Sequence, residues 1–168
     1  AATQAIADYD GPVYLRFGRP KWPNFTPLDK PFEIGKAQQI HEGHDVSIFA
    51  CGHMVWEAMQ ALRVLEEEGI SCDLINLHTI KPLDEEAIIQ SIRKTGCLVT
   101  AEEHQRYGGM GESVAAVMAA HAPCPQEFVA VQDTFGESGK PLDLLAKYGL
   151  TAVHIQEAVR RAVARKKA

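Results

Sequence analysis

The sequence of 168 residues has no long apolar run, no excess of basic residues and no secretory start. No apolar run approaches the roughly 20 residues of a membrane-spanning helix, so we expect no membrane contact. The formal net charge is −5, whereas a nucleic-acid-binding surface is usually basic, so we expect no nucleic-acid partner. The first residues lack the positive charge and apolar core of a signal peptide. These features predict a soluble, cytoplasmic protein.

Cysteine is sparse, and its spacing is not that of a metal or redox site. None of the 4 cysteines belongs to a C-x-x-C pair. Three of them lie in or beside short apolar runs, where a reduced thiol behaves as a small apolar side chain. We therefore expect free thiols in the core, a usage that suits a reducing compartment. The cysteines are Cys51, Cys72, Cys97 and Cys124.

Basic residues cluster only near the end of the chain. We interpret this cluster as the solvated end of a helix, near the negative pole of its dipole. Its members are Arg160, Arg161, Arg165, Lys166 and Lys167.

From residue 45 onward, short apolar runs alternate with segments of helical periodicity. Strands separated by helices imply right-handed crossovers, which produce a parallel sheet with helices on both faces. Ahead of the first run, 34–42 has the character of an antiparallel edge strand. We predict a three-layer α/β/α fold with a mostly parallel sheet of about five strands and one antiparallel edge strand. The expected parallel strands are 46–51, 74–77, 97–101 and 128–131.

Helix boundaries follow from capping residues between these runs. Asp84 is suited to cap a helix because its carboxylate can accept from free amide groups, and Gly96 is suited to end that helix. The other expected helices are 54–68, 114–121, 142–148 and one from 151 onward.

The first 31 residues do not follow this alternation. Residues 5–9 look like the end of a helix and 12–17 like one strand, which has no sheet of its own to join. Four prolines between positions 20 and 31 exclude a helix or a central strand and indicate a stiff, extended linker. We therefore predict a remnant of a preceding domain plus linker at 1–31, and one domain at 32–168.

Polar side chains follow several predicted strands. His53, His78 and His104 each come after a strand, with Glu102 and Glu103 nearby. The carboxyl ends of parallel strands share one edge of a sheet, where ligands of open α/β folds bind. A metal or anion site is one hypothesis and ordinary loop histidines are the other, because a metal needs three or four converging ligands. We expect one glutamate to accept from backbone amides and the other to face water or a partner.

Gly108-Gly109-Met110-Gly111 follows a strand and precedes a helix, which is the context of a phosphate-binding turn. Its spacing is too short for a dinucleotide-binding fingerprint. We interpret it as a tight turn that lets the next helix approach the sheet.

Five segments in order along the chain resemble the transketolase superfamily. Residues 11–19 resemble the last strand of the pyrimidine-binding domain, and 32–37 resemble the entry to the C-terminal domain. Residues 78–84 are similar to an I-K-P-x-D turn, and 100–111 to a T-x-E-E…G-G-x-G element. Residues 133–139 resemble the F-G-x-S-G loop of transketolases. The chain is identified as a transketolase C-terminal domain of the short, split type, with the last strand of the pyrimidine-binding domain before it.

This resemblance implies an enzyme that transfers two-carbon ketol units between sugar phosphates with thiamine diphosphate and a divalent metal (Mg²⁺). In the family, other domains hold that cofactor, so this chain is expected to support assembly and to be inactive alone. It should carry no catalytic, cofactor-binding or metal-binding residue. The expected partners are the pyrophosphate- and pyrimidine-binding domains, a second copy in a homodimer, and the sugar phosphates.

The resemblance also implies one substrate contact. Arg19 matches an arginine that binds the sugar phosphate in transketolases, and a guanidinium fork suits a phosphate group. Pro20 departs from the usual polar residue there, and a surface arginine in a linker is the alternative. Arg16 is the second candidate.

Two other functions stay open. Deoxyxylulose-phosphate synthases and the thiamine-dependent component of 2-oxoacid dehydrogenases share the E-E…G-G-x-G element, although they usually lack the F-G-x-S-G loop. A stand-alone regulatory domain that binds a ligand at the carboxyl edge of its sheet is the third hypothesis.

Overall fold

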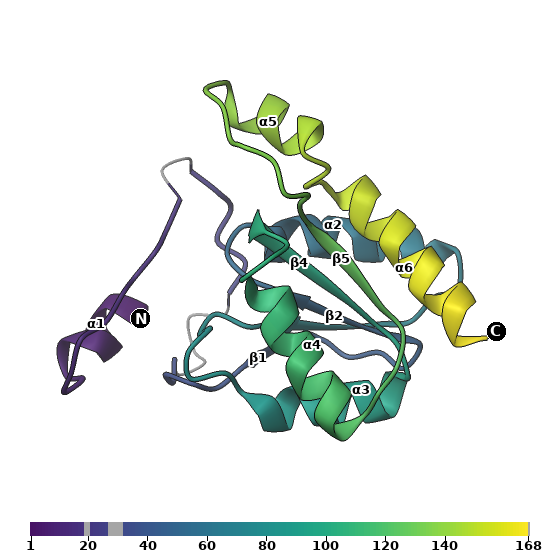
Figure 1. Cartoon of the computed structure of the whole chain (residues 1–168), viewed down its shortest axis with the longest axis horizontal. Helices are drawn as coiled ribbons and strands as arrows, with labels where there is room; N and C mark the ends of the chain where they lie inside the picture. The colour runs from purple at the N-terminus through teal and green to yellow at the C-terminus, as the bar shows by residue number, and fades with distance from the viewer. Residues whose placement is uncertain (19–20, 27–31, 168) are drawn as a thin grey trace.

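The computed structural model describes residues 1–18, 21–26 and 32–167. A five-stranded sheet with the order β1-β3-β2-β4-β5 forms the middle layer (Figure 1). β1 runs antiparallel to β3, and the other neighbours are parallel. The predicted fold class is therefore confirmed. The strands are β1 (Gln38–His41), β2 (Val46–Ala50), β3 (Cys72–Asn76), β4 (Leu98–Gln105) and β5 (Gln126–Val131).

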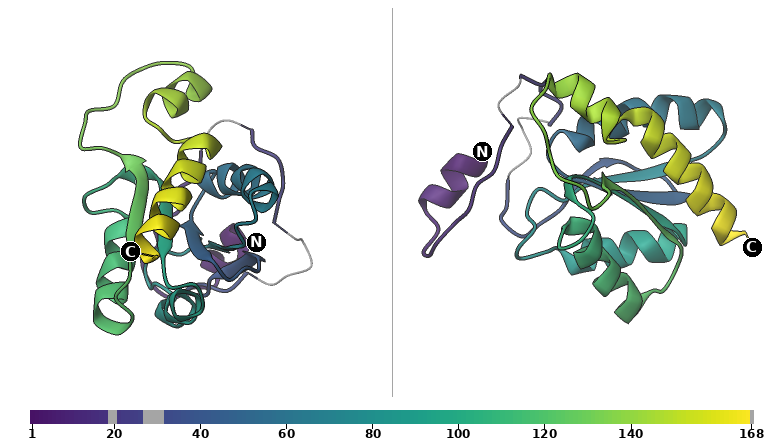
Figure 2. Two further views of the ribbon diagram at one scale, coloured as in Figure 1. Left: turned by 90° about the vertical axis from the view of Figure 1, so that its right-hand side faces the viewer. Right: turned by 45° about the horizontal axis from the view of Figure 1, so that its top comes forward.

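Helices cover both faces of this sheet and separate two apolar cores. α2 and α6 lie together on one face, and α3 and α4 lie together on the other (Figure 1). α5 stands away from the sheet, at the end of an extended segment that follows β5 (Figure 2). No helix of the described ranges is both long and apolar enough to span a bilayer. The helices are α1 (Ala2–Ala7), α2 (Met54–Glu67), α3 (Glu85–Thr95), α4 (Met110–His121), α5 (Pro141–Lys147) and α6 (Ala152–Lys166).

β2 shows why the apolar runs are continuous. All five of its residues are buried, because helices cover the sheet on both sides. Ile48 belongs to the core beneath α2 and α6, whereas its neighbour Phe49 belongs to the core beneath α3 and α4. Ser47 points to the α3 side, where its hydroxyl lies 2.6 Å from those of Ser91 and Thr95. Alternation along one strand thus supplies both cores.

The predicted caps of α3 are present. The Asp84 carboxylate accepts from the backbone N–H of Ala87 at 3.2 Å and from that of Ala37 at 2.8 Å. The same side chain therefore starts α3 and ties down the chain before β1. Gly96 ends the helix in the left-handed conformation, with φ of 71°.

The amino-terminal part differs from the predicted secondary structure in two places. Residues 12–17 form no strand in the described chain, because no neighbouring strand satisfies their backbone groups. Tyr14 and Phe17 are 87% and 82% exposed. The edge strand expected at 34–42 is limited to β1, since Ile34 and Gly35 form a turn. α1 buries no residue, and Figure 1 shows it away from the sheet.

The linker lies partly outside the described residues, but 21–26 are described and contain no helix or strand. They are not simply a spacer, because Trp22 and Phe25 pack against the core beneath α2. The proposed division at residue 31 remains a prediction.

Candidate functional site

The strand order places a topological switch point at the carboxyl ends of β2 and β4. From β2 the chain passes to β3 on one side, and from β3 it crosses to β4 on the other side. Connections that leave a sheet in opposite directions open a space at this switch point, which is the usual ligand position in open α/β folds. His53 follows β2, and Glu103 lies near the end of β4. The pairing of β4 with β5 is irregular between Ala101 and Gln105, so Glu103 sits in a distorted part of the strand.

His53 and Glu103 meet at this switch point. Gly52, with φ of 58°, turns the chain after β2 and places His53 at the N-cap of α2. The His53 Nδ1 atom lies 3.0 Å from Glu103 Oε2. A carboxylate only accepts, so Nδ1–H donates. This hydrogen bond is the main cause that lowers the pKa of Glu103; burial opposes it, and the charges of His53 and Arg16 assist it.

The amino-terminal segment lies against the same pair of residues. The Trp22 ring stacks on the His53 ring, with centroids 4.8 Å apart and an angle of 7°. Arg16 Nη1 donates to the Glu103 carbonyl at 3.3 Å, and Arg16 Nη2 lies 3.8 Å from Glu103 Oε2. We call residues 12–18 and 21–26 the docking segment. It lies at the switch point where other open α/β folds bind a ligand.

Glu102 has a different role from its neighbour. Its side chain is buried, Oε2 accepts from the Met110 N–H, and Oε1 accepts from the Gly111 N–H, both at 2.7 Å. Burial raises the pKa of Glu102, while these amide hydrogen bonds act to lower it. The expectation that one of the two glutamates accepts from backbone amides is confirmed. Because Glu102 occupies the first amides of α4, this helix start is not free to bind a phosphate.

The glycine-rich turn brings α4 close to the sheet, as its sequence predicted. A Cβ at Gly109 would lie 2.5 Å from Glu102 Oε2. A Cβ at Gly111 would lie 2.7 Å from Thr100 Oγ1 and 2.8 Å from Phe128. Only glycine leaves room for this approach.

The other two histidines do not join His53. His78 Nδ1 lies 3.0 Å from Thr79 Oγ1, its ring lies against Phe32, and burial lowers its pKa. His104 lies within β4 instead of after it and is exposed, with Nδ1 donating to the Gln105 carbonyl at 2.9 Å. Across the described chain, no three His, Cys, Asp or Glu side chains gather to hold a metal ion. The metal-site hypothesis is therefore not supported. The carboxylates of Glu102 and Glu103 are already hydrogen-bonded to backbone amides and to His53, so they do not fit a metal–diphosphate site.

The cysteines have no reactive environment. All 4 are free; Cys72 and Cys97 are buried, and the other two are half-buried. Burial is the main cause that raises the pKa of Cys51 and Cys72 to about 12 and that of Cys97 to about 11. Thiols of this kind are protonated at neutral pH and act as packing groups.

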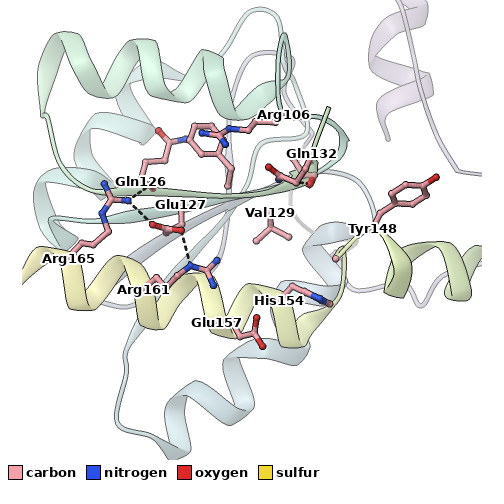
Figure 3. A pocket seen from close by; sticks show the side chains of 13 residues that line it. Arg106, Gln126, Glu127, Val129, Gln132, Tyr148, His154, Glu157, Arg161 and Arg165 are labelled. Atoms are coloured by element: carbon pink, nitrogen blue, oxygen red, sulfur yellow. Dashed lines mark hydrogen bonds and ion pairs between the residues drawn. The ribbon is translucent and has the colours of Figure 1, made fainter. Parts of the chain in front are cut away.

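A cavity of about 600 Å³ lies between β5 and α6 (Figure 3). Two of the arginines that line it form ion pairs with a glutamate of the same cavity. Arg161 Nε and Arg165 Nη1 lie 3.0 and 2.7 Å from the carboxylate of Glu127. Arg165 also donates to the Gln126 carbonyl at 2.9 Å, and Gln132 Nε2 donates to the Ala130 carbonyl at 2.8 Å. These side chains cover backbone groups of the edge strand β5, which protects it from pairing with another chain.

The basic cluster at the chain end is thus not simply solvated. Arg161 and Arg165 contact Glu127, as described above. Arg160 donates to both carboxylate oxygens of Glu68, from Nε at 2.9 Å and from Nη2 at 2.6 Å. Lys166 Nζ donates to the Thr95 carbonyl at 2.6 Å. These contacts tie α6 to α2, β5 and the end of α3.

Of the predicted substrate contacts, Arg19 lies outside the described residues, and Arg16 lies against Glu103. The sequence analysis singled out His53 and Glu103 because they lie at the ends of predicted strands, but it did not predict their contact with each other. Trp22 was missed altogether, because a tryptophan in a proline-rich linker gives no sequence signal for where it will pack.

Comparison with known families decides the identity of this fold. A family model described as "Transketolase, C-terminal domain" matches residues 35–155. The chain belongs to the transketolase C-terminal domain family. This confirms the prediction made from the five segments.

Curated relatives of this transketolase C-terminal domain are longer than the chain. The 6-deoxy-6-sulfo-D-fructose transketolase subunit SqwH of Clostridium sp. (strain MSTE9) is 42% identical over 166 residues, which are 99% of this chain and 52% of that protein. A putative transketolase C-terminal section of Methanocaldococcus jannaschii is 38% identical over 93% of this chain and 49% of its own length. A 1-deoxy-D-xylulose-5-phosphate synthase of Geobacter sulfurreducens is 37% identical, over 97% of this chain and 26% of its own. The chain therefore spans about half the length of the first two.

Solved structures agree with this family. A split-gene transketolase, described as an inactive beta4 tetramer, superposes with a TM-score of 0.93 and 43% identity over 98% of this chain and 55% of its own. A Pichia stipitis transketolase in complex with sedoheptulose 7-phosphate has a TM-score of 0.59 and 20% identity, over 79% of this chain and 18% of its own. This second likeness concerns the fold alone.

Proposed function

We propose that this domain belongs to a split transketolase, which transfers two-carbon ketol units between sugar phosphates in carbohydrate metabolism of the cytoplasm. The main support for this proposal is the similarity to a split-gene transketolase, with 43% sequence identity and a TM-score of 0.93. Thiamine diphosphate and Mg²⁺ are held by the pyrophosphate- and pyrimidine-binding domains. The domain described here supports the assembly, which is a homodimer of the complete catalytic unit.

Arg19 is the proposed contact to the substrate phosphate. It is placed by the resemblance of residues 11–19 to the end of the pyrimidine-binding domain. In the assembled enzyme, Arg19→Ala should raise the KM for phosphorylated substrates more than the KM for unphosphorylated ones. Equal changes for both substrates would remove Arg19 from the site.

The activity is tested by supplying the missing domains. This chain is mixed with polypeptides that carry the pyrophosphate- and pyrimidine-binding domains, together with thiamine diphosphate and Mg²⁺. We expect ketol transfer from a ketose phosphate to an aldose phosphate in the mixture and none from the chain alone. Calorimetric titration should show no thiamine diphosphate binding by the chain alone. Activity or cofactor binding without the other domains would contradict the proposal.

A second function is favoured by the identity to 1-deoxy-D-xylulose-5-phosphate synthases, which is 37% for the Geobacter sulfurreducens protein. The same mixture separates the two. Product formation from pyruvate and an aldose phosphate, without transfer from a ketose phosphate, would assign the synthase reaction instead.

A further inference from the structure

His53 carries a buried polar atom that costs stability. Its side chain is 9% exposed, and Nε2 has no hydrogen-bond partner among the described residues. With Nδ1–H donating to Glu103, the other ring nitrogen, Nε2, is left without a partner. Buried polar groups of this kind are rare because they lose their hydration. A phenylalanine would fill the same space without that loss. A histidine at this position is therefore explained by the contacts of its Nδ1 atom and of its ring face.

Those two contacts hold the docking segment at two points. The ring face carries Trp22, and Phe25 lies over Trp56 of α2 with ring centroids 6.2 Å apart. Nδ1 fixes the Glu103 carboxylate, and Glu103 contacts Arg16 through both its carbonyl and its side chain. His53 and Glu103 thus link the docking segment to the ends of β2 and β4.

Glu103 holds the Arg16 guanidinium but does not pair with all of its N–H donors. Its side chain is 59% exposed, and only two of its nitrogens lie near Glu103. A guanidinium has five N–H donors, so donors of Arg16 remain for an anion beside the docking segment. A flexible arginine loses side-chain entropy when it binds an anion, and a carboxylate that holds it in place reduces this loss.

We propose that Glu103 is a positioning residue for substrate binding. It holds the arginine-bearing docking segment against the C-terminal domain, and His53 orients the Glu103 carboxylate. This docking sets the affinity of the enzyme for the phosphate group of a sugar phosphate. The inference rests on the proposed function for its substrate and on the observed contacts for the docking itself.

Two substitutions of His53 separate its contacts. His53→Phe keeps a ring for Trp22 but removes the donor to Glu103, whereas His53→Asn keeps an amide donor but removes the ring. Glu103→Gln removes the charge that faces Arg16. Arg93→Ala is the control, because Arg93 is exposed in the last turn of α3, at the opposite end of the sheet.

In the assembled enzyme, His53→Phe and Glu103→Gln should raise the KM for phosphorylated substrates about tenfold, the equivalent of about 1.4 kcal/mol. The KM for unphosphorylated substrates and the kcat should change little. His53→Asn should restore most of the affinity, and Arg93→Ala should change neither KM. A loss that is equal for both kinds of substrate, or no loss, overturns the positioning role.

Docking is measured on the chain itself through Trp22. In a Trp56→Phe background, acrylamide quenching of Trp22 should remain low in His53→Phe and rise in His53→Asn. High quenching in the parent chain overturns the docking. If the parent enzyme shows no ketol transfer, the proposed function and the substrate part of this inference both fail, while the quenching result still decides the docking part.

Discussion

At the residue scale, Glu102 and Glu103 show how two adjacent and chemically equal side chains acquire different roles. Successive residues of a strand point to opposite faces of the sheet. Glu102 therefore reaches the start of α4, where two backbone amides hold it, and Glu103 reaches His53 at the start of α2. The first carboxylate shapes the fold, and the second joins the docking segment to it.

Gly111→Ala should destabilise the domain. The added Cβ would meet Thr100 Oγ1 at 2.7 Å and Phe128 at 2.8 Å, both on packed strands that cannot move freely. We expect a loss of about 2 kcal/mol in the free energy of unfolding, measured by urea denaturation. Gly136→Ala is the matched control, since a Cβ there meets nothing within 4 Å. Equal effects of the two substitutions would show that the close approach of α4 is unimportant.

The Glu103 contact should weaken in acid. The pKa of Glu103 is lowered in the folded chain from its ordinary value of 4.5, with the hydrogen bond from His53 as the main cause. A lowered acid pKa stabilises the fold above the ordinary value, and this contribution is lost as the pH falls through the folded value. The free energy of unfolding, measured by urea denaturation, should therefore lose this contribution as the pH falls below 4.5. Glu103→Gln should show little of this pH dependence; an unchanged profile in that variant would contradict the assignment.

At the scale of elements, β5 and α6 depend on each other. β5 is an edge strand, and side chains from α6 and from Gln132 cover its outer backbone groups. α6 in turn is fixed by ion pairs to Glu127 and Glu68. The cavity between them thus lies at a protected strand edge. Figure 3 shows Arg161 and Arg165 of α6 reaching Glu127 of β5.

Arg165→Ala should expose this edge. It removes one hydrogen bond to the Gln126 carbonyl and one ion pair to Glu127, while Arg161 still contacts Glu127. We expect a loss of about 1 kcal/mol in stability and more self-association, since uncovered edge strands pair with one another. Sedimentation velocity over a range of concentrations measures the association. Arg93→Ala, which removes an exposed arginine away from the edge, should leave the protein as it was.

At the scale of the whole molecule, the chain consists of a packed α/β body and an amino-terminal part that touches it at few points. The two cores lie between the sheet and its helices, and α1 adds nothing to either. Trp22 and Phe25 join the docking segment to the body. The anchoring region is therefore short and lies near the carboxyl ends of β2 and β4.

Removing residues 1–11 should leave the stability nearly unchanged, within about 0.5 kcal/mol, because α1 buries no residue. Trp22→Ala should cost more than this deletion, since the stacked ring is lost from His53. Thermal and urea unfolding of both variants provide the comparison. If the deletion proved the more costly, α1 would have to pack on the body.

The sequence by itself determined the layers of this fold. Periodicity and capping suffice for that, because a buried strand must be apolar on both faces, and a helix needs partners for its free amides, as at Asp84. The close packing of the G-G-x-G turn was likewise readable, since only glycine permits it. The positions of His53 and Glu103 at the ends of predicted strands, together with the carboxyl-edge rule, correctly drew attention to them.

Only the tertiary structure decided which of these groups meet. Whether 12–17 becomes a strand depends on a neighbour for its hydrogen bonds, and the described chain supplies none. Whether three histidines converge depends on distances between loops, which strand spacing does not determine. The contacts of Trp22 with His53 and of Arg16 with Glu103 join parts of the chain 31 and 87 residues apart. Such contacts depend on how the chain closes in space, so they could be found only in the folded molecule.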